Sequence, residues 1–406
     1  MSFPPLGLPH VMFAWGAIAA LSVINVVRPF RPTVTIGTIA FFAGWLTGEL
    51  AVHHALLHAV ALGVGAYFGA IAGPWGYSGA ALVVASIAGL VAIHWRGQAT
   101  GELARRALLP VAEGFDASPV SLGSVLSPFT TKERGVVVVR GLEVAKIKGR
   151  TLHAEVFHRA DMPKNAPVLV YVHGGGWVVG FRRFQGNPLL SALAAAGWVC
   201  VRVSYRLSPI ATFPDHVHDV ARGVHWAKKN AARFGGDGDW VAIAGNSAGA
   251  HLSSTLALGH DIDALLPDDL RGEDLSVRAC VGLYGVYDFQ NRHGHWPGLG
   301  LVPFVERVVM KARLAKHPEL FRLASPVDLV RPDAPPYLLV HGDRDTLAPV
   351  HESRRFHEAL TKTSKQGAAY LEVPGAQHAF EIFHSVRGQW AVRTIVAFLQ
   401  AVRARG

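Results

Sequence analysis

A serine between two glycines, Ser247 in the pentapeptide GNSAG at residues 245–249, has the surroundings that best suit a nucleophile. The apolar run at residues 240–244 precedes the pentapeptide, and a helix-like segment at residues 250–258 follows it. A G-x-S-x-G sequence between a strand and a helix predicts a nucleophile elbow. This tight turn presents the serine oxygen at a helix N-terminus, where negative charge is stabilised. The context therefore favours a nucleophilic serine over a simple Gly/Ser turn.

A second glycine-rich segment, HGGGW at residues 173–177, follows the apolar run at residues 168–172. Glycines allow backbone N–H groups to approach a substrate closely. Such donors, together with the N–H of the residue after the nucleophile, would stabilise the negative charge that develops on a substrate oxygen. We therefore predict that Gly175, Gly176 and Ala248 form an oxyanion hole.

An acid and a histidine follow the serine, in the chain order Ser, acid, His that folds with such a strand–turn–helix elbow use. Asp343 and Asp345 follow the apolar run at residues 337–340, and His378 follows a short strand-like run at residues 369–373. The histidine would take the proton of the serine, and the carboxylate would orient the imidazole and stabilise its charged form. We predict Asp345 as the acid and Asp343 as a turn residue, because aspartate often bonds to the backbone of its own turn.

The elements that must position these residues alternate between short apolar runs and helical patterns from about residue 135 onward. Five of the runs are typical of strands that are buried on both faces. They comprise residues 168–172, 199–203, 241–244, 279–283 and 337–340. This alternation predicts an α/β fold with a mostly parallel sheet and helices on both faces. Active sites of such sheets lie at the carboxyl ends of the strands, where the motifs above are found.

Four motifs, in this order, resemble those of the hormone-sensitive-lipase-like family of bacterial esterases: HGGGW, GNSAG, GDRDTL and QHAF. The resemblance extends over about residues 130–406. It implies an α/β-hydrolase fold and a serine carboxylesterase or lipase-like hydrolase that forms an acyl-enzyme and uses no cofactor or metal. Asn246 stands where the family usually has Asp, and Ala250 stands where it usually has Gly. We expect both changes to leave the chemistry intact while altering local hydrogen bonds.

The acyl-enzyme step is shared by several activities, so ester hydrolysis has alternatives. A membrane-bound acyltransferase or a deacetylase would use the same triad. A non-catalytic membrane scaffold is a third interpretation, because a fold does not fix a function. Such a scaffold would be expected to lack a triad or oxyanion residue, and the sequence retains all of them.

The first hundred residues contain four uncharged apolar runs. They comprise residues 11–27, 33–48, 55–73 and 77–93. A membrane-spanning helix needs about 20 apolar residues, so each run is near the lower limit, but together they predict three or four membrane helices. A signal peptide is the alternative for the first run, and the lack of Lys and Arg in residues 1–10 argues against it.

The runs suggest three parts: membrane-embedded helices at residues 1–96, a linker at residues 97–126 and a catalytic domain at residues 127–406. Members of the esterase family usually have N-terminal cap helices over the active site, and here membrane segments take their place. We expect the acyl pocket to be covered by the linker, by an insertion at about residues 287–323 or by the membrane. The insertion is either an amphipathic lid or a helix that packs on the sheet.

Four polar residues, Glu49, His53, His54 and His58, interrupt the apolar runs. They indicate either a turn at the water interface or a polar site within the membrane, since buried ionisable groups there are often functional. The second interpretation would suit a channel or transporter fused to a hydrolase.

The composition also indicates membrane contact. Half of the residues are hydrophobic and 17% are charged, against about 25% in typical soluble domains. The net charge of +10 comes from scattered Lys and Arg, which favours an anionic membrane surface over nucleic acid as a partner. A basic surface that is simply solvated is favoured over both. We therefore expect a multi-pass membrane protein whose partners are a small-molecule or lipid ester and membrane lipid, with no nucleic acid.

Overall fold

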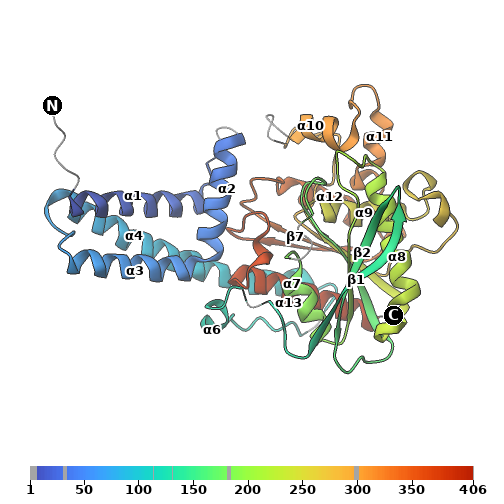
Figure 1. The fold of residues 1–406 in the computed structure, drawn as a ribbon, viewed down its shortest axis with the longest axis horizontal. Helices are drawn as coiled ribbons and strands as arrows, with labels where there is room; N and C mark the ends of the chain where they lie inside the picture. Colours follow the sequence, from blue (N-terminus) through green and yellow to red (C-terminus); the bar gives the residue numbers. More distant parts are fainter. Residues whose placement is uncertain are drawn as a thin grey trace.

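The computed structural model describes residues 7–30, 34–112, 114–129, 131–180, 184–296 and 301–405. Residue 33 of the second apolar run and residues 297–300 of the predicted insertion lie outside this part. The described residues form a helical N-terminal region and an α/β domain, which lie end to end in Figure 1.

In the described part of the chain, eight strands form one sheet in the order β1-β2-β4-β3-β5-β6-β7-β8. The pairs β1–β2 and β2–β4 are antiparallel, and the other neighbouring strands are parallel. The strands are β1 (Val136–Ile147), β2 (Arg150–Arg159), β3 (Ala166–Val172), β4 (Val199–Val203), β5 (Gly236–Asn246), β6 (Cys280–Leu283), β7 (Tyr337–Gly342) and β8 (Ala368–Val373). The predicted α/β class with a mostly parallel sheet is confirmed.

Burial explains why the central runs form strands. Every residue of β4, β6 and β7 is buried, as expected where helices cover both faces of a sheet. The edge hairpin of β1 and β2 turns at Lys148 and Gly149, whose φ values are 48° and 76°. Two positive φ values are those of a type I′ turn, whose twist matches that of the two strands it joins.

Helices cover both faces of the sheet (Figure 1). On one face, α8, α9 and α12 bury their apolar residues in the core, and on the other face α5, α7 and α13 do so. The helices of this domain are α5 (Thr100–Leu108), α6 (Leu122–Val125), α7 (Asn187–Ala195), α8 (Asp215–Asn230), α9 (Ala248–Gly259), α10 (Leu301–Phe304), α11 (Pro318–Leu323), α12 (His351–Thr363) and α13 (Val386–Ala404). Residues 97–126, which we expected to be a linker, thus contain α5, a helix that packs into the core.

The N-terminal region consists of α1 (Leu8–Val27), α2 (Val34–Glu49), α3 (Ala51–Tyr67) and α4 (Gly73–Gln98). Helices α1, α3 and α4 extend side by side away from the sheet, and α2 stands across their end next to the α/β domain (Figure 1). The backbones of α1 and α4 touch at glycines, since a Cβ on Gly16 would lie 2.4 Å from the carbonyl oxygen of Gly79. Small residues permit such close packing between membrane helices.

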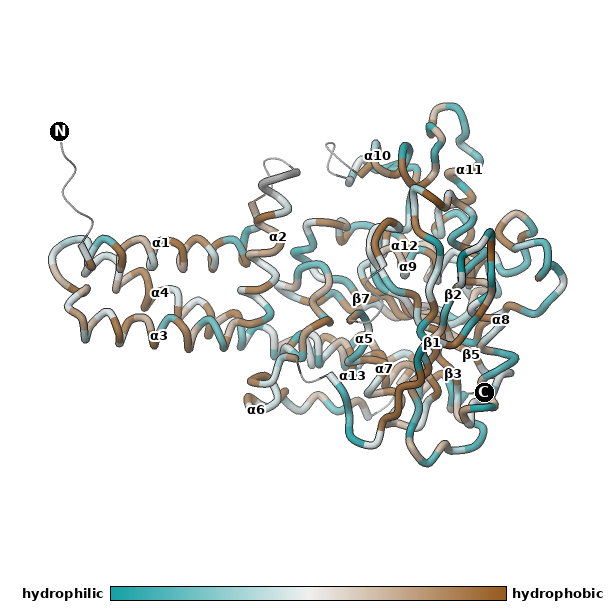
Figure 2. The backbone as a smooth tube through the Cα atoms, in the orientation of Figure 1, coloured by the Kyte–Doolittle hydropathy of each residue, from teal (hydrophilic) through white to brown (hydrophobic). Residues whose placement is uncertain are grey.

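Among the described residues, two helical stretches, Leu8–Val27 and Gly73–Leu108, are long and apolar enough to cross a membrane. The segments Gly37–Glu49 and Ala51–Tyr67 meet the same requirement only as a pair, and their axes are bent by 88°. The second predicted run therefore corresponds to a helix that turns away from the other three. Hydrophobic residues recur along α1, α3 and α4, whereas many surface loops of the α/β domain are hydrophilic (Figure 2).

Candidate active site

Ser247 lies in the turn between β5 and α9, where the sequence predicts a nucleophile elbow. Ser247 has φ 54° and ψ −123°, a conformation that side-chain-bearing residues rarely adopt and that active sites often retain. A Cβ on Gly245 would lie 2.4 Å from the backbone of Gly249, and one on Gly249 would lie 2.1 Å from the carbonyl oxygen of Val172. Both glycines are therefore required for the turn to close against β3.

His378 joins Ser247 to Asp345, as the sequence predicts. Its Nε2 lies 2.9 Å from the Ser247 Oγ, and its Nδ1 lies 2.6 Å from the Asp345 Oδ2. The second carboxylate oxygen of Asp345 accepts hydrogen bonds of 2.8 Å from the backbone N–H groups of Leu347 and Ala348. The imidazole is thus held between a hydroxyl and a carboxylate, the arrangement that activates a serine for nucleophilic attack.

The electrostatics of Asp345 keep its carboxylate charged. Burial would raise the pKa of Asp345, but the nearby His378 and His341 outweigh this effect through charge and hydrogen bonding and lower the pKa below its usual range. His341 Nε2 lies 3.2 Å from the same carboxylate oxygen that contacts His378. Asp343, the alternative acid, instead accepts a hydrogen bond of 2.6 Å from the N–H of Gly375, in the loop after β8.

The loop after β3 brings the predicted oxyanion residues beside the serine. Gly175 and Gly176 line the same pocket as Ser247, and their φ values of 125° and 57° suit glycine. At Gly175 a Cβ would lie 2.0 Å from the carbonyl oxygen of Val179. Ala248 is the first residue of α9, so its N–H lies at a helix N-terminus, which favours negative charge.

Asn246 contributes contacts that the sequence alone could not place. Its Oδ1 accepts a hydrogen bond of 2.7 Å from the Gly174 N–H, and its Nδ2 lies 3.1 Å from the Tyr284 hydroxyl and 3.4 Å from the Glu381 carboxylate. Tyr284 in turn packs on His378, with ring centroids 4.5 Å apart. Asn246 therefore connects the oxyanion loop to the segment that carries His378.

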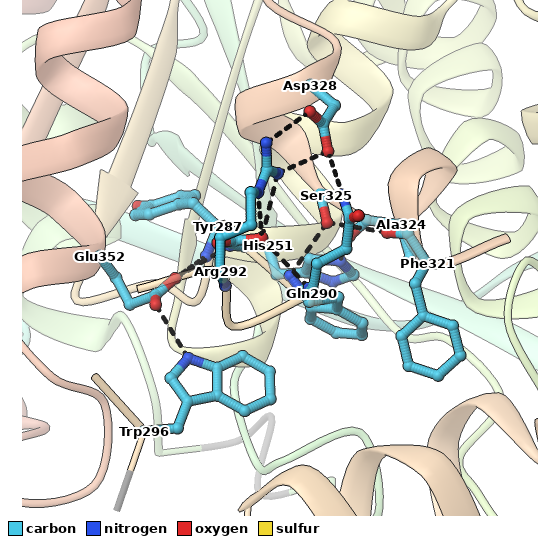
Figure 3. Close-up of polar contacts among 12 residues, drawn as sticks. His251, Tyr287, Gln290, Arg292, Trp296, Phe321, Ala324, Ser325, Asp328 and Glu352 are labelled. Carbon is cyan, nitrogen blue, oxygen red and sulfur yellow. Dashed lines mark hydrogen bonds and ion pairs between the residues drawn. The ribbon is translucent and has the colours of Figure 1, made fainter. Parts of the chain in front are cut away.

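The predicted insertion is anchored to the α/β domain by buried polar contacts (Figure 3). One oxygen of Glu352 accepts hydrogen bonds from the N–H groups of Tyr287 and Asp288, and the other accepts one from the Trp296 indole. The Nε2 of His251, in α9, lies 2.8 Å from the carbonyl oxygen of Ala324, the residue that follows the predicted insertion.

The middle of the insertion supplies part of the core and part of the pocket. Val305, Val309 and Met310 are buried in the core on the α9 face of the sheet. Leu301 and Phe304 line the pocket at Ser247. The alternatives were an amphipathic lid and a helix that packs on the sheet, and the described part of the insertion matches the packed segment better than the lid.

The pocket that opens at Ser247 has a volume of about 380 Å³, within the range of ligand sites in proteins. Three of its lining side chains come from the N-terminal region: Phe41, Phe42 and Trp45 of α2. We expected the linker, the insertion or the membrane to cover this pocket. In the structure the insertion lines the pocket together with α2, which we did not predict. No local sequence signal marks these aromatic residues, because they are about 200 residues or more from the serine in the chain and reach it only through tertiary packing.

The sheet order, the elbow after β5 and the loops after β7 and β8 place the chain among the α/β hydrolases. It belongs to the BD-FAE family, whose model matches residues 155–360. The chain is 43% identical over 249 residues to esterase LipC of Mycobacterium tuberculosis, which covers 61% of this chain and 62% of that protein. It is 40% identical over 258 residues to the probable carboxylic ester hydrolase LipM of the same organism, which covers 63% of this chain and 59% of the relative.

These matches leave part of each protein uncovered. The chain spans about three fifths of the length of the curated relatives it matches. Among solved structures, a fungal esterase from Rhizomucor miehei covers 66% of this chain and 85% of its own, with a TM-score of 0.55 and 23% identity. A truncated carbohydrate esterase from gut microbiota covers 66% of this chain and 96% of its own, with a TM-score of 0.56 and 19% identity. These two likenesses show the fold.

Proposed function

We propose that this chain is a serine carboxylic-ester hydrolase in which Ser247 is the nucleophile, His378 the general base and acid, and Asp345 the residue that orients the imidazole. One observation carries the proposal: a single imidazole lies 2.9 Å from the serine oxygen and 2.6 Å from a buried carboxylate. The ionised state of Asp345 favours the imidazolium that forms during the reaction. The names of the relatives support the same class of activity.

The proposed reaction begins when the Ser247 Oγ attacks the carbonyl carbon of an ester and its proton passes to the His378 Nε2. The carbonyl oxygen becomes an oxyanion, which the N–H groups of Gly175, Gly176 and Ala248 stabilise. The ester C–O bond then breaks, and the alcohol leaves with the proton from His378. Water attacks the acyl-enzyme in the same way, and release of the carboxylic acid restores the serine.

We also propose that the N-terminal helices lie in a membrane, so that hydrolysis takes place at the bilayer surface. Two stretches of this region have the length and composition of spanning helices. Large apolar side chains are exposed on α1, α3 and α4, including Ile18, Val60 and Val84. A membrane would bury this surface, which in water would favour aggregation.

The catalytic assignment is tested by replacing Ser247 with Ala in the full-length protein. We expect the Ser247→Ala variant to lose hydrolysis of p-nitrophenyl butyrate by on the order of 10⁴-fold or more, since the nucleophile is removed. The variant should keep the circular dichroism spectrum of the parent and should no longer be labelled by a fluorophosphonate. The exposed Ser118 offers a matched control, and Ser118→Ala should retain both activity and labelling. Hydrolysis that survives in Ser247→Ala would refute the assignment.

A further inference from the structure

The pocket at Ser247 is polar at one end and apolar along the rest of its wall. Its polar side chains are those near the triad: Gln185, Asn246, Tyr284 and His378 accompany the serine. The remaining wall is formed mainly by apolar side chains, and among the described residues no Lys, Arg, Asp or Glu lines this pocket. A wall of this kind suits a hydrocarbon chain, because removing apolar area from water is favourable.

Helix α2 forms one side of the apolar wall and lies directly against the segment that carries the histidine. The Trp45 indole N–H donates a hydrogen bond of 3.0 Å to the carbonyl oxygen of Ala379, the residue after His378. The Trp45 ring also packs on Phe383, with centroids 4.8 Å apart. Phe41 is buried, whereas Phe42 is 52% exposed, so Phe42 lies at the mouth of the pocket.

Buried polar contacts fix the C-terminal end of α2 to the α/β domain. The Ser385 hydroxyl donates a hydrogen bond of 2.6 Å to the Glu49 carboxylate. The Arg387 guanidinium donates hydrogen bonds to the carbonyl oxygens of Gly48, at 3.2 Å, and of Ile93, at 3.3 Å. Glu49 and Arg387 are both buried, and their groups lie 3.8 Å apart. Buried, hydrogen-bonded contacts of this kind hold α2 in place, because breaking them would leave unpaired charges.

We infer that α2 is the substrate-selecting wall of the active site and that the enzyme prefers esters with a long apolar chain. The carbonyl group of such an ester lies at Ser247 while its chain lies between the α2 aromatic residues and Phe304. This inference rests on the proposed ester hydrolysis and adds the substrate class. Phe41, Phe42 and Trp45 are specificity-determining residues of that reaction.

The inference is tested by chain-length selectivity in the full-length protein in detergent micelles. We would measure kcat/KM for p-nitrophenyl acetate and p-nitrophenyl decanoate and take the ratio of decanoate to acetate. We expect this ratio to exceed 1 in the parent and to fall about tenfold in Phe42→Ala, since about 1.4 kcal/mol of lost contact corresponds to a factor of ten. Phe68, an aromatic residue that is 64% exposed after α3, provides the control, and Phe68→Ala should leave the ratio unchanged.

The outcomes separate this inference from the proposed function. A parent that hydrolyses acetate but not decanoate would overturn the apolar-chain preference and leave the triad in place. An unchanged ratio in Phe42→Ala would overturn the role of α2. The milder Phe41→Leu variant should also lower the ratio. A decrease in both variants would show that the change does not come from misfolding of one of them. A parent that hydrolyses neither ester would overturn the proposed function itself.

Discussion

At the scale of single residues, the two aspartates after β7 differ in what their carboxylates contact. Asp345 is buried against His378 and is bound by two backbone N–H groups. Asp343 is partly exposed and bonds to a turn. The turn argument from the sequence does not explain this difference, because the carboxylate that bonds to the backbone of its own turn is that of Asp345, whereas Asp343 bonds to Gly375 in the loop after β8.

This difference predicts unequal effects of two matched substitutions. Asp345→Asn should lower kcat by roughly 10⁴-fold, because the amide favours the wrong tautomer of the histidine. Asp343→Asn should lower kcat by less than about tenfold, since an amide oxygen can still accept the Gly375 N–H bond. Steady-state rates on p-nitrophenyl butyrate measure both effects. A larger loss in Asp343→Asn would show that Asp343 is the acid.

A second residue, Glu381, lies behind the site and is fully buried. Burial raises the pKa of Glu381 from its ordinary value of 4.5 to about 7, despite a hydrogen bond with Tyr284. The folded protein therefore binds more protons than the unfolded chain between these values, so this group makes the protein less stable as pH rises from about 4.5 through 7. Each pKa unit corresponds to about 1.4 kcal/mol.

The Glu381→Gln substitution should remove this penalty. We expect the variant to melt at a higher temperature than the parent at pH 8.5, by an amount equivalent to at most about 3 kcal/mol, and to show a much smaller difference at pH 5. Thermal unfolding in detergent measures the shift. Glu358→Gln, at an exposed position of α12, serves as the control. If Glu381→Gln were less stable than the parent at pH 8.5, the charged carboxylate would instead be stabilising.

At the scale of elements, the sequence predicts the strands and the elbow well because their signals are local. Apolar runs that are followed within two residues by a glycine identify β3, β5 and β7, and the same runs position HGGGW, GNSAG and Asp345 at or after their carboxyl ends. The role of α2 has no local signal. Its Trp45 bonds to a residue 334 positions further along the chain, and its direction depends on the bend at Leu50.

For α5, the sequence predicts the helix but not the residues against which it packs. Residues 101–109 have the pattern of a short amphipathic helix, and the proline-containing stretch around it suggests a linker. In the structure Ala104 and Leu108 of α5 are fully buried in the α/β core. Gly101 packs so closely on Trp390 that a Cβ there would lie 2.5 Å from the indole ring. Amphipathic periodicity predicts the buried face of a helix but not the partner that covers it.

At the scale of the whole molecule, the proposed membrane location has a direct test. We expect full-length protein to sediment with membranes and to stay there in high salt and in alkaline carbonate. Salt screens attraction between surface charges within about 8–10 Å, so it would release a protein held only by its charge of +10. It would not release buried apolar helices. Recovery of the protein in the soluble fraction without detergent would contradict the proposal.

The buried Arg387 junction has a further consequence for how such an enzyme would meet its substrate. Because Arg387 bonds to both the end of α2 and the end of α4, the helical region and the α/β domain are held together without a flexible tether at this point. If the helices lie in a bilayer, Ser247 keeps a constant height above the lipid, and the proposed enzyme searches for its ester in two dimensions. The rate would then follow the mole fraction of ester within the surface, and inert lipid would slow the enzyme by dilution at constant bulk concentration.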